Sequence, residues 1–194
     1  MPSSVLLNDL HEALKVRQEL QQPTTGAAEA SAFSLSDEDI AMAFAQQYTS
    51  AGGVMYYACT EEELKQHLIN IRRQLNNAAI ACCSDTLSSF LQNLGFKDSF
   101  PCVAGERYLV GAIVCDALEA WNGAVVVTDM LGIGTRLQQM PTATITIAFT
   151  SQLTRDWPEV LEHLKASYHT LPKEIVSFTP HDLKYPYLIL VEDS

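Results

Sequence analysis

Residues 36–95 alternate between helical and strand-like patterns, and this alternation limits the fold more than any other feature of the sequence. Apolar residues recur at helical spacing in three stretches, which are separated by short apolar runs at 54–58 and 78–83. The run 78–83 is apolar on both faces, which is typical of a central strand in a parallel sheet. Strands that alternate with helices build a sheet covered by helices. We therefore expect an α/β domain.

Capping residues mark the ends of the helices expected in this region. Ser36 and Thr60 each stand three residues before an acidic residue, which is the spacing of a capping box. Ser84 or Asp85 can cap the third helix, and glycines follow the first and third helices. The apolar side chains at helical spacing, which we expect in the core, are Ile40, Phe44, Tyr48, Leu64, Leu68, Ile71, Leu75, Leu87, Phe90, Leu91 and Leu94.

The second half of the chain has a different rhythm. Strand-like runs at 108–115 and 124–128 are only about eight residues apart, which is too short for an ordinary parallel crossover. A glycine-containing stretch at 129–142 reads as a loop, and strands are expected at 143–149 and 187–191. Asp156, followed by Pro158 and Glu159, opens a further helix. Together these elements predict a mixed, mainly parallel sheet.

The N-terminal part is set apart from this domain by its composition. Residues 1–21 carry Leu7, Leu10 and Leu14 on one helical stripe, so we expect a helix there. Residues 22–34 are rich in polar and small residues and predict a flexible linker, which leaves 35–194 as the α/β domain. The leading helix docks either on this domain or on a partner, and the sequence leaves both open.

Charge and hydropathy exclude several classes of partner. With 23 acidic and 12 basic residues the net charge is −11, so we expect no nucleic-acid partner; the densest basic spot is only Arg72-Arg73. No apolar run approaches the roughly 20 residues of a membrane span, and no signal peptide is recognisable. We expect a cytoplasmic protein without membrane contact. Five cysteines without framework spacing are interpreted as small buried hydrophobes in a reducing compartment.

Strong motifs for metals and phosphates are missing from the sequence. It contains no Walker-type loop, no C-x-x-C pair and no H-E-x-x-H, and its histidines are never four residues apart on a helix. Its cysteines do not cluster as an iron–sulfur centre requires. We therefore expect no metal site and no cofactor in this chain.

A glycine-flanked arginine is the most suggestive loop. Gly132 and Gly134 let backbone amides approach an anion, and Arg136 could hold a carboxylate or phosphate through two hydrogen bonds. The alternative is a tight connection with a surface arginine.

Two titratable residues are candidates for catalysis, although the catalytic group remains unknown. Asp116 follows a strand, where ligands of α/β sheets gather, but it could equally cap a helix. His181, beside Asp182, could act as acid or base near neutral pH, or could simply be solvated. Asn122-Gly123 reads as a turn.

Several segments together resemble one known family, the LUD-domain proteins of the lactate-utilization protein C type. Residues 37–83 follow its order of elements, and 111–118 with 122–128 resemble its G-I-T-x-x-D-x-x-I-A-x-T-G-T-x-x-x-T stretch. Arg136 with Pro141 is similar to its R-x-x-x-x-P-P-x-H-I-x-V, and His181 with Lys184 to its G-x-H-G-P-R/K. The resemblance covers about residues 36–193.

The resemblance implies a NagB/RpiA/CoA-transferase-like fold, with three α/β/α layers and an added N-terminal helix. It implies an accessory role in bacterial L-lactate oxidation beside separate iron–sulfur proteins, with a small anionic ligand. The residues that we expect around this ligand are Asp116, Asn122, Gly123, Gly132, Gly134, Arg136, His181 and Lys184. Alternatives are a sugar-phosphate or CoA-ester enzyme of the same superfamily and a degenerate, non-catalytic interaction module. Whether the chain is an enzyme or a homo-oligomer stays open.

The sequence also departs from the family pattern. Trp121-Asn122-Gly123 replaces the T-G pair and the charged residue before it, and the histidine of P-P-x-H is absent after Pro141. The family's G-P-S-x-T-x-D-I-E segment is missing before His181. These departures predict an altered or lost ligand. Every functional expectation here depends on a cleft in which Asp116, Arg136 and His181 meet.

Overall fold

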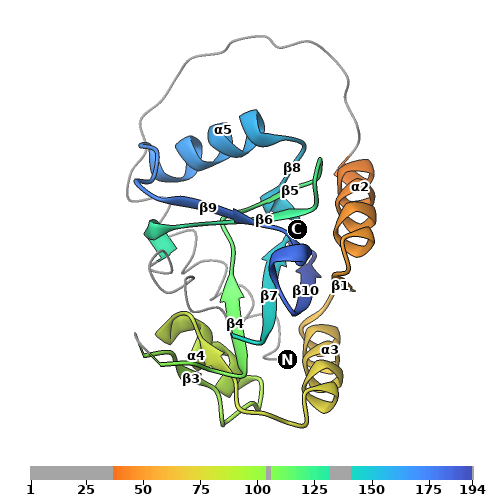
Figure 1. The fold of residues 1–194 in the computed structure, drawn as a ribbon, viewed down its shortest axis with the longest axis vertical. Coiled ribbons are helices and arrows are strands. Elements are labelled where there is room, and N and C mark those ends of the chain that lie inside the picture. The colour runs from red at the N-terminus through yellow and green to blue at the C-terminus, as the bar shows by residue number, and fades with distance from the viewer. Residues whose placement is uncertain (1–36, 104–105, 132–140, 194) are drawn as a thin grey trace.

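The computed structural model describes residues 37–103, 106–131 and 141–193, and they form two β-sheets with four α-helices (Figure 1). The first sheet is parallel throughout. Its strands, in spatial order, are β1 (Val54–Ala58), β10 (Tyr185–Val191), β7 (Ala143–Phe149), β4 (Val110–Val114), β2 (Ala81–Cys82) and β3 (Phe100–Pro101). The helices are α2 (Asp37–Ser50), α3 (Glu61–Gln74), α4 (Asp85–Asn93) and α5 (Trp157–Tyr168).

The second sheet contains the antiparallel pairs. Its order is β8 (Leu153–Thr154), β5 (Ala117–Glu119), β6 (Ala124–Thr128) and β9 (Ile175–Phe178), and β6 runs antiparallel to both of its neighbours. Its strands cross those of the first sheet, and α5 covers its outer side (Figure 1). The α/β class with a mainly parallel sheet is therefore confirmed, whereas the sequence did not predict the division into two sheets.

Side-chain caps begin three of the helices, as the sequence predicted. Thr60 Oγ1 accepts a hydrogen bond from the Glu63 N–H at 3.2 Å. Ser84, rather than Asp85, caps α4 by accepting from the Leu87 N–H at 3.2 Å. Asp156 caps α5 through the Glu159 N–H at 3.1 Å. These bonds satisfy N–H groups that the first helical turn leaves without a partner.

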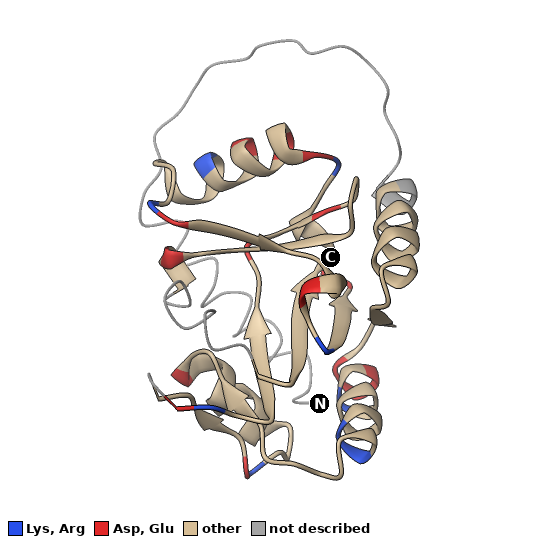
Figure 2. Ribbon diagram, in the orientation of Figure 1, with Lys and Arg blue, Asp and Glu red and all other residues tan. Residues whose placement is uncertain are grey.

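Burial follows the predicted apolar stripes. The α2 face of Ile40, Phe44 and Tyr48 is buried, and so are the corresponding faces of α3 and α4. The strands of the first sheet contain no charged residue, and the charges of the described residues lie mainly on helices and loops (Figure 2). Strands β4 and β7 are buried along their whole length, as expected for a parallel sheet that is covered on both faces.

Strand β10 is the last element of the described chain and lies inside the sheet. It pairs with β1 on one side, where Val54 aligns with Tyr187, and with β7 on the other, where Ala143 aligns with Tyr185. The predicted strand 78–83 is shorter than expected, because only Ala81–Cys82 pairs regularly with both β4 and β3. The short strands β3, β5, β8 and β9 were not predicted.

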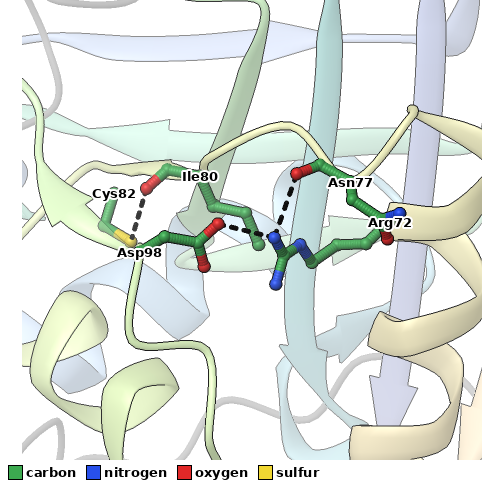
Figure 3. A network of polar contacts seen from close by, with 5 residues as sticks. All are labelled: Arg72, Asn77, Ile80, Cys82 and Asp98. Carbon is green, nitrogen blue, oxygen red and sulfur yellow. Dashed lines mark hydrogen bonds and ion pairs between the residues drawn. The ribbon is translucent and has the colours of Figure 1, made fainter.

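Arg72 connects α3 to the segment that follows α4 (Figure 3). Its Nη2 donates to Asp98 Oδ2 at 2.6 Å and to the Asn77 carbonyl at 3.1 Å. The guanidinium also lies 5.6 Å from the centre of the Phe96 ring. The nearby thiol of Cys82 donates to the Ile80 carbonyl at 3.8 Å. Arg72 is thus engaged within the fold.

Two further expectations concern the N-terminal region and contact with a membrane. The predicted N-terminal helix, the linker and the Ser36 cap lie outside the described residues. Within the described ranges, no helix combines the length and apolar character that crossing a bilayer requires.

Candidate functional site

Asp116 lies where the chain passes from the first sheet to the second. It follows the carboxyl end of β4, and its N–H donates to the Val126 carbonyl of β6 at 2.8 Å. Its carboxylate accepts a hydrogen bond from the hydroxyl of Tyr168, the last residue of α5. Backbone and side chain of Asp116 together therefore connect the end of β4 to β6 and α5.

Burial changes the acidity of Asp116. The residue is only 7% exposed, and burial raises its pKa from 3.8 to about 6. Hydrogen bonds from Tyr168 and Thr128 oppose this rise, and the negative charge of Asp129 adds a little to it. A carboxyl with a pKa of about 6 suits a general base, but the Asp116 side chain is largely shielded from solvent.

Two residues of α5, His163 and Tyr168, lie beside Asp116 and were not predicted as site residues. His163 hydrogen-bonds to the Asp116 carbonyl, and burial, the larger influence, lowers the pKa of the imidazole. Tyr168 is a buried residue at the end of α5. A buried tyrosine hydroxyl usually finds a hydrogen-bond partner, and this was the signal that could have linked Tyr168 to a buried carboxylate. We call Asp116, Thr128, His163 and Tyr168 the Asp116 cluster.

Asn122 and Gly123 form the turn between β5 and β6, as expected. Asn122 Oδ1 accepts a hydrogen bond from the Ala124 N–H at 3.1 Å. Burial raises the pKa of Glu119, and a hydrogen bond from the Asn122 side chain opposes this rise. Gly123 has a φ of +67°, and a Cβ on it would come within 2.6 Å of the Tyr48 backbone nitrogen in α2. Both residues therefore have a structural role in this turn. Their role as ligand-binding residues stays a prediction.

The remaining predicted site residues are dispersed or undescribed. Gly132, Gly134 and Arg136 lie outside the described residues. His181 is exposed in the 3-10 turn η4 (Pro180–Asp182), between β9 and β10. Lys184 is exposed, with Nζ 5.5 Å from the centre of the Tyr185 ring.

The direction of the strands separates Lys184 from Asp116. Lys184 precedes the amino end of β10, whereas Asp116 follows the carboxyl end of β4. Because β10, β7 and β4 are parallel and in register, these two residues lie at opposite ends of the sheet. The structure does not bring them together, and the expected meeting of Asp116 with Arg136 and His181 stays a prediction.

A groove of about 860 Å³ lies at the carboxyl ends of β1 and β10, in the size range of ligand pockets. One wall is α2, and the turn η3 (Thr150–Gln152) contributes Thr150 and Ser151 to the lining. Its lining is mainly apolar, and we call it the α2–β10 groove. It is lined by Ile40, Ala41, Met42, Ala45, Met55, Tyr57, Thr150, Ser151, Leu153, Leu190, Glu192 and Asp193.

The polar end of this groove is acidic. Asp193 accepts hydrogen bonds from Thr150 Oγ1 at 2.5 Å, from the Ser151 N–H at 2.8 Å and from the Ser151 hydroxyl. Glu192 hydrogen-bonds to the Cys59 thiol and raises its pKa, which makes Cys59 a weaker nucleophile. Burial and then the charge of Glu192 raise the pKa of Tyr57. A lining of this kind suits an apolar group that carries a cationic or hydrogen-bond-donating end.

Burial lowers the reactivity of three of the five cysteines by raising the pKa of their thiols. It raises the pKa of Cys82 to about 12, that of Cys83 to about 11, and that of Cys115 well above its ordinary value. These three fit the expected role as small buried hydrophobes, whereas Cys59 is exposed, which corrects that expectation. Among the described residues, no group of three or more His, Cys, Asp or Glu side chains is arranged to hold a metal ion.

Comparison with known proteins yields a likeness in structure. No protein-family model and no curated protein matches the chain. A crystal structure of a DUF162 family protein from Deinococcus radiodurans is similar, with a TM-score of 0.65 and 17% sequence identity. The likeness covers 81% of this chain and 99% of that one. At this level of identity it shows that the two proteins share a fold.

Proposed function

We propose that this chain is a LUD-domain protein and an accessory component of L-lactate oxidation that acts beside separate iron–sulfur proteins. DUF162 is the LUD domain family. The observation that carries the proposal is the shared fold, which extends over 99% of the DUF162 protein. The segment resemblances at 111–118, 122–128 and around His181 point to the same family.

The state of the cysteines supports a division of labour with partner proteins. Iron–sulfur clusters are held by cysteine thiolates. Cys82, Cys83 and Cys115 are buried in the core, where burial raises the pKa of each thiol. Oxidation of lactate to pyruvate removes two electrons and two protons, so the electron acceptors belong on the iron–sulfur partners. In this proposal the present chain binds those partners or the small anion, with Arg136 as the anion-binding residue.

Genetic deletion tests the proposed function directly. Removal of the gene should abolish growth on L-lactate as sole carbon source while leaving growth on glucose unchanged. The wild-type gene supplied in trans should restore growth, and lactate-dependent reduction of an artificial dye in cell extracts should follow the same pattern. A gene carrying Arg136→Ala should restore growth poorly. Unchanged growth of the deletion strain on lactate would contradict the proposal.

A second candidate is the non-catalytic interaction module, and the burial of Asp116 favours it. A general base or carboxylate nucleophile has to touch its substrate. Asp116 is 7% exposed and is held by Tyr168, as a structural residue would be. For such a module, Asp116→Asn should restore growth as fully as the wild-type gene does. Loss of growth with a correctly folded Asp116→Asn protein would refute this reading.

A further inference from the structure

Helix α2 has a second face that the other described residues leave partly exposed. Its core face is buried, but Ala41, Met42 and Ala45 line the α2–β10 groove, and Met42 is 72% exposed. Two alanines four residues apart lie side by side on a helix and leave room for another helix to approach closely. An apolar groove with such a wall is suited to receive an amphipathic helix.

The sequence contains a segment with the matching pattern. We propose that residues 4–20, which lie outside the described residues, occupy the α2–β10 groove of the same chain. Leu7, Leu10 and Leu14 follow the spacing i, i+3, i+7, which places them on one stripe of a helix. In the groove this stripe packs against Met42, Met55 and Leu153, which belong to three different elements of its wall. The docking is independent of the proposed role in lactate oxidation.

The point of attachment favours docking within one chain. The described chain starts at Asp37, the first residue of α2, and Ile40, in its first turn, lines the groove. Residues 21–36 therefore lead directly to the groove wall. A random coil of this length would have a root-mean-square span of roughly 22 Å, about the length of α2 itself. A tether that matches its span gives a high effective concentration, so a weak contact suffices.

Charge favours one orientation of the docked segment. Residues 4–20 carry three acidic residues and two basic ones, Lys15 and Arg17, which follow the leucine stripe. Attraction between exposed groups is weak, but it favours the orientation in which Lys15 and Arg17 lie beside Glu192 and Asp193 of the groove lining.

Hydrogen exchange of the full-length protein, read by mass spectrometry, tests the docking. Amides of residues 4–20 should exchange at least about tenfold more slowly than in a synthetic peptide of residues 1–22. The double variant Leu10→Asp/Leu14→Asp should bring them to the rate of the free peptide. Peptides from 40–45 and 54–57 should then exchange faster, because the groove is uncovered. Met42→Lys changes the groove instead of the segment that occupies it, and it should have the same effect on residues 4–20.

The matched control is Leu109→Lys, which changes another leucine that is 70% exposed but lies outside the groove lining. It should leave the protection of residues 4–20 unchanged, and circular dichroism verifies that all variants are folded. Free-peptide exchange of residues 4–20 in the wild-type protein would overturn the proposal. So would protection that survives Met42→Lys, or protection that appears only as the protein concentration rises, which would assign the groove to a second copy.

Discussion

At the scale of single residues, the buried carboxyl of Asp116 makes the stability of the fold depend on pH. Hydrogen bonds from Tyr168 and Thr128 favour its charged form, and burial opposes them more strongly. The net result is a folded-state pKa of about 6, above the ordinary 3.8. The native state therefore binds more protons than the unfolded state between these two values. Its free energy of unfolding must fall as the pH rises through this window.

Asp116→Asn should remove this pH dependence. The asparagine cannot ionise, and its oxygen can still accept from Tyr168. Relative to the wild type, the variant should gain up to about 3 kcal/mol in free energy of unfolding between about pH 4 and pH 7.5. Urea unfolding at both pH values measures the gain. Glu162→Gln, at an exposed position of α5, is the control. An equal difference between wild type and Asp116→Asn at both pH values would contradict the assignment.

Arg72 contributes through geometry as well as charge. A lysine would keep the charge but lose the planar group that reaches Asp98 and Asn77 and covers Phe96. Arg72→Lys should therefore lower the free energy of unfolding by about 1–2 kcal/mol. The same substitution at the exposed neighbour Arg73 should change it by less than about 0.5 kcal/mol. Equal effects of the two substitutions in urea unfolding would show that Arg72 acts only as a surface charge.

At the scale of elements, the β5–β6 turn contacts α2 backbone to backbone. Gly123 combines a left-handed conformation with this contact, whereas Gly52, with a φ of +90°, has open space around its Cβ position. The two glycines therefore separate conformational strain from steric overlap.

Substitution of each glycine by alanine should show the difference. Both variants adopt an unfavourable backbone, at about 1–2 kcal/mol each. Gly123→Ala also forces the turn away from Tyr48, which should cost at least about 1 kcal/mol more. Thermal and urea unfolding measure both values. A Gly123→Ala protein as stable as Gly52→Ala would mean that α2 and the turn can move apart freely.

The elements also differ in how well the sequence predicts them. The helices are recognisable from Thr60, Ser84 and Asp156, because each cap bonds to a backbone N–H only three residues away. Strands β3 and β8 contain two residues each, and so short a segment has no periodicity to detect. The candidate site was also predicted only in part. The turn at Asn122 was predicted, but the contact of this turn with α2 was not.

At the scale of the whole molecule, the order of the strands couples the two halves of the described chain. Strand β10 separates β1 from β7, and its residues from Pro186 to Val191 are buried. Without β10, the N-terminal strand would lose its neighbour and two sheet edges would be exposed. The first sheet cannot form before residues 185–191 are present.

A chain that ends after Lys184 should consequently fail to fold. We expect it to lack a cooperative urea transition and to show the circular dichroism of a largely unfolded protein. A chain that ends after Val191 is the control, because it keeps β10 and loses the hydrogen bonds of Asp193 to Thr150 and Ser151. It should fold with reduced stability. A cooperative transition in the shorter chain would show that the remaining strands form a sheet on their own.

The sequence by itself determined the α/β class, the starts of the helices and their buried faces. Capping and apolar stripes act between residues a few positions apart, so they can be read along the chain. Only the tertiary structure decided that β10 lies beside β1, that Asp116 faces Tyr168, and that α2 forms a groove with β10. These partners are far apart in sequence, and the contacts that select them depend on burial and strand direction across the whole fold.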